Sequence, residues 1–504
     1  MNLFHDLQRN VPADPAAPFL AVDDGRSFSY GDLDRLSARA AHALVGAGVG
    51  VGDRVVVQVD KSPEAVFLYL GCLRAGAVYV PLNTAYTTAE VSYFVNDAEP
   101  AAVVCRPESR EAIGSLTAAT VLTLGADGAG SLADAMAAGD DGFADAARAD
   151  DDLTAILYTS GTTGVSKGAM LTRSNLASNA RALADVWRFR ADDVLLHALP
   201  LFHTHGLFVA VHCTLMSGSR MIFQARFSAS AALARLPEAT VMMGVPTFYV
   251  RLLDEPGLNA EACRNMRLFT AGSAPLLPAT FEAFAERTGH RVLERYGMTE
   301  TGMITSNPYD GERIAGTVGY PLPDVEVRIA DDQGKALPAG EKGMLEVRGP
   351  NVFAGYWRKP EKTAEEFRAD GFFITGDVAI MAPDGRVAIV GREKDLVISG
   401  GFNVYPQEIE ALIDDVAGVK ESAVIGLPHP DFGEGVTAVV VPDGNGEVDE
   451  ASVLAALGGR LARFKQPKKV IVVDSLPRNA MGKVQKSALR TQYAGLYSSA
   501  SDPA

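Results

Sequence analysis

Short apolar runs alternate along most of the chain with stretches whose apolar positions recur at helical spacing. The apolar runs lie at residues 54–59 (RVVVQV), 101–105, 154–157, 193–197 and 240–243, and the helical spacing is clearest at residues 33–45 and 63–75. Short apolar runs bounded by turn residues are typical of buried strands, and strands that alternate with helices are typical of parallel sheets. The pattern predicts an α/β architecture for this part of the chain.

The rhythm changes from about residue 318. Short strand patterns at 325–329, 344–347, 378–381 and 387–390 are separated by turn residues at 331–334 and 383–385. This spacing predicts a strand-rich segment, which we expect to form a distorted β-barrel. After the polar stretch GREKD, strand and helix patterns restart at 396–398, 406–413 and 423–425. We therefore expect a large body over residues 1–391, a hinge at 392–395 and a small α+β domain over 396–504.

Composition and charge narrow the classes of partner. The chain has 504 residues with 46 basic and 62 acidic side chains, a net charge of −16, so its surface as a whole repels nucleic acid. The segment 125–152, rich in Ala, Asp and Gly, is expected to be an acidic surface excursion. The four cysteines stand far apart, which excludes a disulfide framework and a paired-cysteine zinc site. With no long apolar run and no signal peptide at the N-terminus, we expect no membrane span and a cytoplasmic protein.

The strongest chemical signal is the loop YTSGTTGVSKG at residues 158–168, which follows the strand pattern TAIL. Glycines allow tight turns that present backbone N–H groups, hydroxyls add donors, and Lys167 adds positive charge, so the loop can wrap a polyphosphate. It is not a Walker A loop, because Ser166 stands where that motif requires glycine. Taken alone, the stretch could equally be a flexible surface loop.

Further motifs follow in a fixed order: AGAVYVPLN (75–83), PLFHTHG (200–206), GSAP (272–275), YGMTE (296–300), TGD (375–377), GREKD (391–395) and PRNAMGK (477–483). Together with the glycine-rich loop, this set resembles the adenylate-forming superfamily, which includes the acyl-CoA synthetases. The resemblance implies ATP, Mg²⁺ and CoA as cofactors or cosubstrates and a reaction in two steps. A carboxylate attacks the α-phosphate of ATP, and the CoA thiol then attacks the acyl-adenylate.

The resemblance also implies a set of nucleotide-binding residues. They are Thr159, Ser160, Gly161, Thr162, Thr163, Gly164 and Lys167 in the loop, Ala274 and Pro275, then Tyr296, Gly297, Thr299, Asp377 and Arg392. Tyr296 is expected to stack on adenine, Thr299 to contact phosphate, and Asp377 to accept hydrogen bonds from the ribose hydroxyls. Glu300 is expected to hold Mg²⁺, which prefers oxygen ligands. The alternatives are a helix cap for Thr299, a turn for Asp377 and a surface position for Arg392.

Two lysines near the C-terminus carry the catalytic part of the resemblance. Lys483 in PRNAMGK matches the lysine that stabilises charge on the α-phosphate during adenylation. Lys394 in GREKD matches the hinge, whose rotation would replace Lys483 at the active centre with Gly400 and Gly401. A protein lysine acetyltransferase is a further expected partner, since acetylation would remove the charge of Lys483.

Four segments bear on which acid the protein activates. They are HTHGLFVA (203–210), GVPTFYVRLL (244–253), LERYGMTET (293–301) and GEGVTAVVV (433–441). They are more similar to malonyl-CoA synthetases than to other acyl-CoA synthetases. A dicarboxylate needs a cation for its second charge, and Arg251 is the first candidate because it interrupts an apolar helical run four residues after Thr247. We expect Ser273, Thr204, Met303 and His203, also a catalytic candidate, to line the pocket; Arg295 is a weaker rival to Arg251, and His205 and Arg226 are weaker still.

The sequence thus predicts an ATP-dependent ligase that joins malonate, or methylmalonate, to CoA. Within the same class, the alternative is a ligase for acetate or propionate. A protein that binds nucleotide on the same fold without catalysis is the alternative from another class. The joint presence of Lys483, Glu300, Asp377 and Arg392 argues against it.

Overall fold

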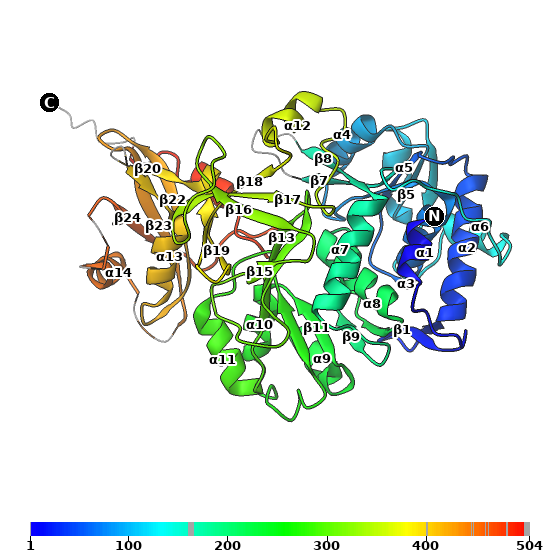
Figure 1. The fold of residues 1–504 in the computed structure, drawn as a ribbon, viewed down its shortest axis with the longest axis horizontal. Coiled ribbons are helices and arrows are strands. Elements are labelled where there is room, and N and C mark those ends of the chain that lie inside the picture. Colours follow the sequence, from blue (N-terminus) through cyan, green and yellow to red (C-terminus); the bar gives the residue numbers. More distant parts are fainter. Residues whose placement is uncertain are drawn as a thin grey trace.

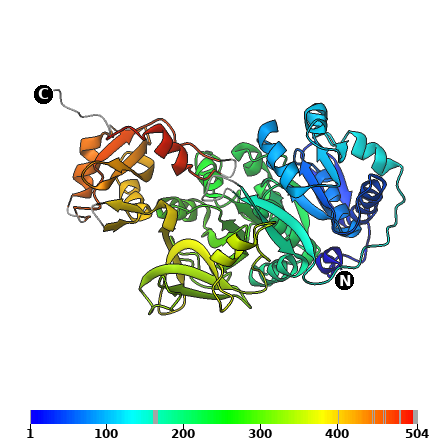
Figure 2. The same ribbon diagram turned by 90° about the horizontal axis from the view of Figure 1, so that it is seen from above.

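A computed structural model describes residues 2–159, 166–399, 402–444, 446, 448–458, 460–461, 463–479 and 482–497. Three sheets form the large N-terminal part and a fourth forms a small C-terminal domain, which lies at the opposite end of the molecule from the first sheet (Figures 1 and 2). The predicted α/β architecture with a small second domain is confirmed.

The first sheet has six strands in the order β6-β5-β3-β4-β7-β8. Its strands are β3 (Arg54–Gln58), β4 (Val78–Pro81), β5 (Ala102–Cys105), β6 (Thr120–Thr123), β7 (Leu153–Thr159) and β8 (Lys167–Thr172), with helices α2 (Tyr30–Gly46), α3 (Pro63–Ala75), α4 (Thr88–Ala98), η1 (Pro107–Ser109), α5 (Arg110–Gly114) and α6 (Ser131–Ala137). All neighbours pair in parallel except the hairpin β7–β8, in which Thr159 is opposite Lys167. The two ends of the glycine-rich loop therefore lie side by side.

The second sheet has nine strands in the order β15-β14-β13-β12-β11-β9-β10-β1-β2. They are β1 (Pro18–Val22), β2 (Ser27–Ser29), β9 (Val194–His197), β10 (Arg220–Phe223), β11 (Val241–Gly244), β12 (Leu268–Ala271), β13 (Leu293–Met298), β14 (Gly302–Ser306) and β15 (Tyr320–Pro321). Its helices are α1 (Leu3–Leu7), α7 (Arg173–Val186), η2 (His205–Val211), α8 (His212–Ser217), α9 (Ala229–Arg235), η3 (Leu236–Glu238), α10 (Pro246–Leu253) and α11 (Pro278–Thr288). The motifs PLFHTHG, GSAP and YGMTE begin where β9, β12 and β13 end or nearly end, which gathers them at one edge.

The strand-rich segment is a four-stranded antiparallel sheet, β16-β17-β18-β19. Its elements are β16 (Glu326–Ala330), β17 (Lys342–Arg348), β18 (Phe373–Met381) and β19 (Val387–Arg392), with helix α12 (Pro360–Glu366) between β17 and β18. We expected a distorted barrel here, but the segment forms an open sheet. In the described part of the chain, no strand pairing joins β16 to β19. Four short strands are too few to close on themselves with filled interior packing.

The C-terminal domain has its own sheet, in which β22 (Val419–His429) and β23 (Gly433–Pro442) form a long hairpin flanked by β20 (Val397–Ser399), β21 (Phe402–Val404) and β24 (Lys469–Val472). Helices α13 (Pro406–Asp414), α14 (Glu450–Leu457) and α15 (Lys486–Gln492) cover it. Its buried apolar side chains form clusters separate from those of the N-terminal part. The short helix η4 (Glu393–Asp395) connects β19 to β20, so the expected hinge falls between two hydrophobic cores, and its role as a hinge stays a prediction.

The acidic segment 125–152 is held against the body at several points. Leu132 and Met136 of α6 are buried, and the buried Arg74 of α3 forms an ion pair of 2.6 Å with Asp145. A cation at the end of a helix whose other residues are almost all apolar needs such a partner when it is buried. Across the described residues, no helix combines the length and the apolar character needed to cross a bilayer.

Candidate active site

Three of the predicted nucleotide-binding residues meet where β13, β18 and β19 come together, near the centre of Figure 1. Tyr296 donates a hydrogen bond from its hydroxyl to Asp377, and Arg392 Nε lies 2.7 Å from Asp377 Oδ1. Burial, together with the Asp377 carboxylate, raises the pKa of Tyr296 well above its usual value. Asp377 is only 2% exposed, so the arginine supplies the positive charge that a buried carboxylate needs.

A second cluster surrounds the two ends of the glycine-rich loop. Glu300 Oε1 accepts hydrogen bonds from Thr159 Oγ1 at 3.2 Å and from the Tyr356 hydroxyl at 3.1 Å. Lys167 Nζ lies 2.9 Å from Glu366 Oε1 and 4.0 Å from the centre of the Tyr356 ring. Thr159, Lys167 and Glu300 are thus brought together as predicted, whereas Tyr356 and Glu366 carry no sequence signal that would have placed them here.

Several predicted residues fall outside the residues that the structure describes. They are Ser160, Gly161, Thr162, Thr163 and Gly164 of the loop, and Gly400 and Gly401 between β20 and β21. Their proposed contacts with phosphate and with the pantetheine arm stay predictions.

The Glu300 carboxylate is a suitable ligand for a Mg²⁺ ion that would bind together with ATP. This carboxylate is buried, and burial raises its pKa. No group of three or more metal-ligating side chains occurs among the described residues, so the site is no protein cage for a metal ion. A magnesium ion is usually held by one or two carboxylates together with substrate phosphates, and Glu300 beside the ends of the loop suits that arrangement.

The turn after β12 carries Ser273, Ala274 and Pro275. Ser273 has a left-handed backbone (φ 71°), Ala274 is half-buried and Pro275 is exposed, so part of this turn is accessible from outside the protein. Gly297 sits where β13 bends, and a Cβ atom there would lie 2.1 Å from the Gly302 carbonyl oxygen. Any side chain at Gly297 would therefore push β14 away, and with it Met303.

A buried guanidinium lies beside the turn after β12. Arg295 is 3% exposed, and its Nε and Nη2 atoms have no hydrogen-bond partner in the structure. A Cβ atom at Gly272 would lie 2.3 Å from Arg295 Nη1, so only glycine leaves room for the side chain. Burial lowers the pKa of Arg295 to about 10, and the group remains a cation at neutral pH.

Histidines line this cation. His203 Nδ1 accepts a hydrogen bond from the His205 backbone at 3.2 Å, and His205 Nδ1 lies 3.4 Å from Ser273 Oγ. Burial, followed by the charges of Arg295 and Lys483, lowers the pKa of His203 to about 4. Both histidines are therefore neutral near pH 7, His205 because burial and Arg295 lower its pKa well below the usual value.

The other acyl-pocket candidates divide into buried and exposed groups. Thr204 is buried with an unpaired hydroxyl, and Met303 is buried and fixed by backbone contacts with the Asn179 amide. Arg251 is exposed on α10, one turn after Thr247, and Arg226 is exposed as well. Of the three arginines that sequence patterns bring forward, Arg295 is enclosed by protein and Arg251 and Arg226 are not.

The loop that carries Lys483 reaches the N-terminal part. A Cβ atom at Gly482 would lie 2.8 Å from Thr247 Oγ1 of α10, so the loop lies directly against that helix. Lys483 keeps solvent access, but the walls of the cleft and the charge of Arg392 lower its pKa to about 8. The charges of Lys483 and of Arg295 both contribute to lowering the pKa of His203.

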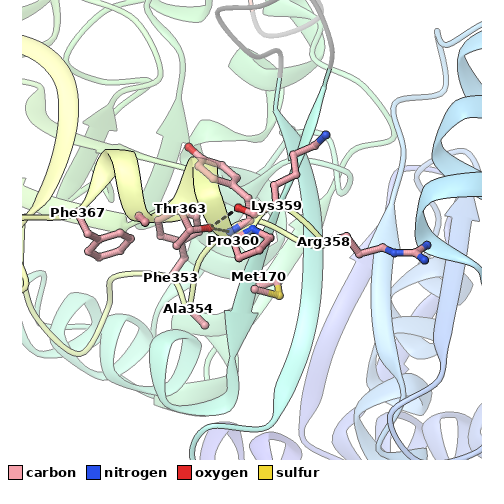
Figure 3. A pocket seen from close by; sticks show the side chains of 10 residues that line it. Met170, Phe353, Ala354, Arg358, Lys359, Pro360, Thr363 and Phe367 are labelled. Atoms are coloured by element: carbon pink, nitrogen blue, oxygen red, sulfur yellow. Dashed lines mark hydrogen bonds between the residues drawn. The ribbon is translucent and has the colours of Figure 1, made fainter.

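A pocket of about 570 Å³ opens beside the phosphate end of the site, between β8 and α12. Figure 3 shows Thr363 and Phe367 on its α12 side and Met170 on its β8 side. The pocket leaves one side of α12 uncovered, although the same helix carries Glu366 toward Lys167.

Two family models match most of the chain. The AMP-binding enzyme family matches residues 7–357, and the AMP-binding enzyme C-terminal domain matches residues 408–483. The chain belongs to the AMP-binding enzyme family. This chain is an acid–CoA ligase that forms AMP and uses ATP and CoA.

Similar proteins act on different acids. The chain is 36% identical to the feruloyl-CoA synthase of Amycolatopsis sp over 93% of this chain and 94% of that protein. It is 35% identical to the malonate–CoA ligase of Arabidopsis thaliana over 93% and 85% of the two chains. Among solved structures, ATP-bound MatB from Rhodopseudomonas palustris is 57% identical, superimposes with a TM-score of 0.97, and matches 99% of this chain and 100% of its own.

Proposed function

We propose that this AMP-forming ligase activates malonate and transfers the malonyl group to CoA. The observation that carries the proposal is the buried guanidinium of Arg295, two of whose nitrogens have no partner in the structure. An unpaired buried cation is costly, and an anionic part of the substrate would remove the cost. A second carboxylate supplies that charge, whereas the uncharged ends of acetate, propionate and ferulate do not.

We assign the second carboxylate of the substrate to Arg295, although the sequence patterns favoured Arg251. Arg295 is buried and lies over Gly272, whereas Arg251 is exposed on α10. Arg251 shares the helix face of Thr247, which touches the Gly482 loop, so it remains a second cation for the mouth of the pocket. Ser273, Thr204 and Met303 would line the walls of the acyl pocket.

The chemistry follows from the charges around the site. In the first step an oxygen of the reacting carboxylate attacks the α-phosphorus and pyrophosphate leaves. Lys483 would stabilise the charge that builds on the phosphate oxygens, and a neutral His203 would leave the attacking carboxylate unprotonated. In the second step the CoA thiolate attacks the acyl carbon and AMP leaves. Tyr296, Asp377 and Arg392 would hold the adenosine through both steps.

Glu300 is the residue proposed to hold Mg²⁺. When bound there with ATP, the ion would neutralise charge on the departing pyrophosphate. Thr159 and Tyr356, which donate to the Glu300 carboxylate, would keep its orientation fixed.

A panel of acids tests the proposal. Pyrophosphate release and CoA-thioester formation would be measured with malonate, methylmalonate, acetate, propionate and ferulate. Malonate should give the highest kcat/KM in both assays, with methylmalonate the nearest competitor. A preference for ferulate or propionate would refute malonate as the substrate. Turnover of none of the acids, with ATP still bound, would favour the non-catalytic alternative.

Regulation by acetylation of Lys483 is proposed as well. The side chain keeps solvent access, and Lys486 lies three residues away on α15. Acetylation would remove the charge that adenylation needs. Mass spectrometry of the protein from cells that lack deacetylases should find the acetyl group on Lys483. Full adenylation activity of the fully acetylated enzyme would refute the idea.

A further inference from the structure

The side chain of Lys167 forms an ion pair with a carboxylate of the protein itself. Its Nζ atom lies 2.9 Å from Glu366 Oε1 and over the ring of Tyr356, and its side chain is only 9% exposed. Burial would raise the pKa of Glu366, but hydrogen bonds from Tyr356 and Lys167 outweigh it and hold that pKa below the usual range. Before ATP binds, the loop lysine is therefore neutralised by a carboxylate that is not part of the proposed nucleotide contacts.

Glu366 has other partners that do not depend on Lys167. The Tyr356 hydroxyl lies 2.6 Å from Glu366 Oε2, and Lys362 Nζ lies 3.3 Å from Glu366 Oε1, one turn earlier on α12. Two ammonium groups thus share one carboxylate oxygen. If Lys167 moved away, Glu366 would keep a hydrogen bond and a cation.

We propose that Glu366 is a resident counter-anion that Lys167 exchanges for the polyphosphate of ATP, while Lys362 and Tyr356 keep Glu366 neutralised. The inference rests on the proposed function, in which the enzyme uses ATP, and on the contact between Lys167 and the polyphosphate that the glycine-rich loop predicts. It does not depend on which acid is activated. Its physical basis is a balance of charges. A buried ammonium left alone would be costly, and so would a buried carboxylate left alone, but the exchange leaves neither unpaired.

The exchange predicts opposite effects for two substitutions in one helix. Glu366→Gln keeps the size of the side chain but removes the competing charge, so the Kd for ATP should fall by about three- to tenfold. Lys362→Met removes the substitute cation, which binds Lys167 more firmly to Glu366, so the Kd for ATP should rise by about two- to fivefold. A general disturbance of α12 would weaken ATP binding in both variants.

Calorimetric titration with ATP and Mg²⁺, in the absence of any acid, measures both effects on the intact enzyme. Titration with AMP serves as the internal control, because AMP lacks the β- and γ-phosphates that would reach Lys167, and its Kd should change by less than about twofold in either variant. Glu365→Gln is the matched control on α12. Glu365 pairs with Lys362 at 2.9 Å, whereas Lys167 pairs with Glu366, so this substitution should also change the Kd for ATP by less than about twofold.

Weaker ATP binding in Glu366→Gln would overturn the exchange and make Glu366 a residue that orients Lys167. Equal strengthening in Glu365→Gln would also overturn it, since a loss of negative charge anywhere on α12 would then suffice. Lys167→Met separates this inference from the assignment on which it rests. If that variant binds ATP as the unmodified enzyme does, Lys167 does not contact the polyphosphate, and both statements fail. If it binds ATP weakly while Glu366→Gln binds no more tightly, only the exchange fails.

Discussion

The guanidinium of Arg295 passes so close to Gly272 that a Cβ atom there would lie 2.3 Å from Nη1. Gly272 belongs to the turn that ends β12, and Arg295 comes from the neighbouring strand β13. One residue without a side chain therefore decides whether the cation can occupy the acyl pocket. A substitution at Gly272 can therefore displace the Arg295 guanidinium without removing its charge.

Gly272→Ala should displace the Arg295 guanidinium and lower kcat/KM for malonate by about tenfold or more, in line with a misplaced charged group. The loss should be smaller for propionate, which has no second carboxylate. Gly46→Ala is the control, because a Cβ atom at Gly46 would meet no atom within 4 Å. Equal losses for both acids in Gly272→Ala would mean that the turn, rather than the arginine, was disturbed.

Lys483→Ala should lower the rate of adenylation by about 10²–10³, the usual effect of losing one donor to a transition-state oxyanion. Thioester formation from preformed malonyl-adenylate and CoA should keep most of its rate. Lys486→Ala, which removes a nearby lysine that pairs with Glu410, is the control. Equal losses in the two half-reactions would contradict the role given to Lys483.

The pH dependence of adenylation follows from the same lysine. Lys483 must be protonated to stabilise the phosphate oxygens, and burial together with Arg392 lowers its pKa to about 8. The kcat/KM for ATP should therefore be constant near pH 7 and fall as the pH rises above about 8, because deprotonation removes the charge. Lys483→Arg should move this decline to higher pH. His203, with a pKa of about 4, should add no decline between pH 6 and 8.

Lys394→Pro should spare adenylation and block thioester formation. A proline fixes φ, so it would hinder the rotation expected between the two hydrophobic cores. Pyrophosphate exchange and thioester formation would be measured on the same preparation. Lys394→Ala leaves the backbone free and should support both reactions. If Lys394→Pro also supports both, the pivot lies elsewhere in 392–395.

Local patterns predicted much of the fold. The apolar runs at 54–59, 101–105 and 240–243 correspond to β3, β5 and β11, and helix α3 begins and ends at the expected residues. Each of these strands follows from its own apolar run, and α3 follows from the helical spacing of its apolar residues and from its caps, all of which a single sequence displays. The strand-rich segment was predicted as a distorted barrel and is an open sheet, because closure depends on pairing between distant strands, which no local pattern reports.

The site was predicted in part. Asp377, Arg392 and Tyr296 stand in motifs and meet in the structure, but the pairing of Lys167 with Glu366 joins side chains 199 positions apart. Glu366 lies in an ordinary charged helix, TAEEF, where an acidic residue is most often solvated. The rank of Arg295 over Arg251 likewise needed the fold. Arg251 interrupts an apolar run and Arg295 follows directly after Glu294, so neither local pattern reports which arginine is buried, and only the packing of β12 against β13 distinguishes them.

The central claim is that a buried arginine selects a dicarboxylate, and the ratio of kcat/KM for malonate to kcat/KM for propionate tests it most directly. This ratio would be measured in the unmodified enzyme, in Arg295→Leu and in Arg251→Leu. Removing one member of a buried charge pair costs about 3–5 kcal/mol, so the ratio should fall by roughly two to four orders of magnitude in Arg295→Leu, through loss of malonate turnover with propionate spared, and by less in Arg251→Leu. A ratio that is unchanged in Arg295→Leu and collapses in Arg251→Leu would give the second carboxylate to the exposed arginine, and a ratio unchanged in both would contradict the account.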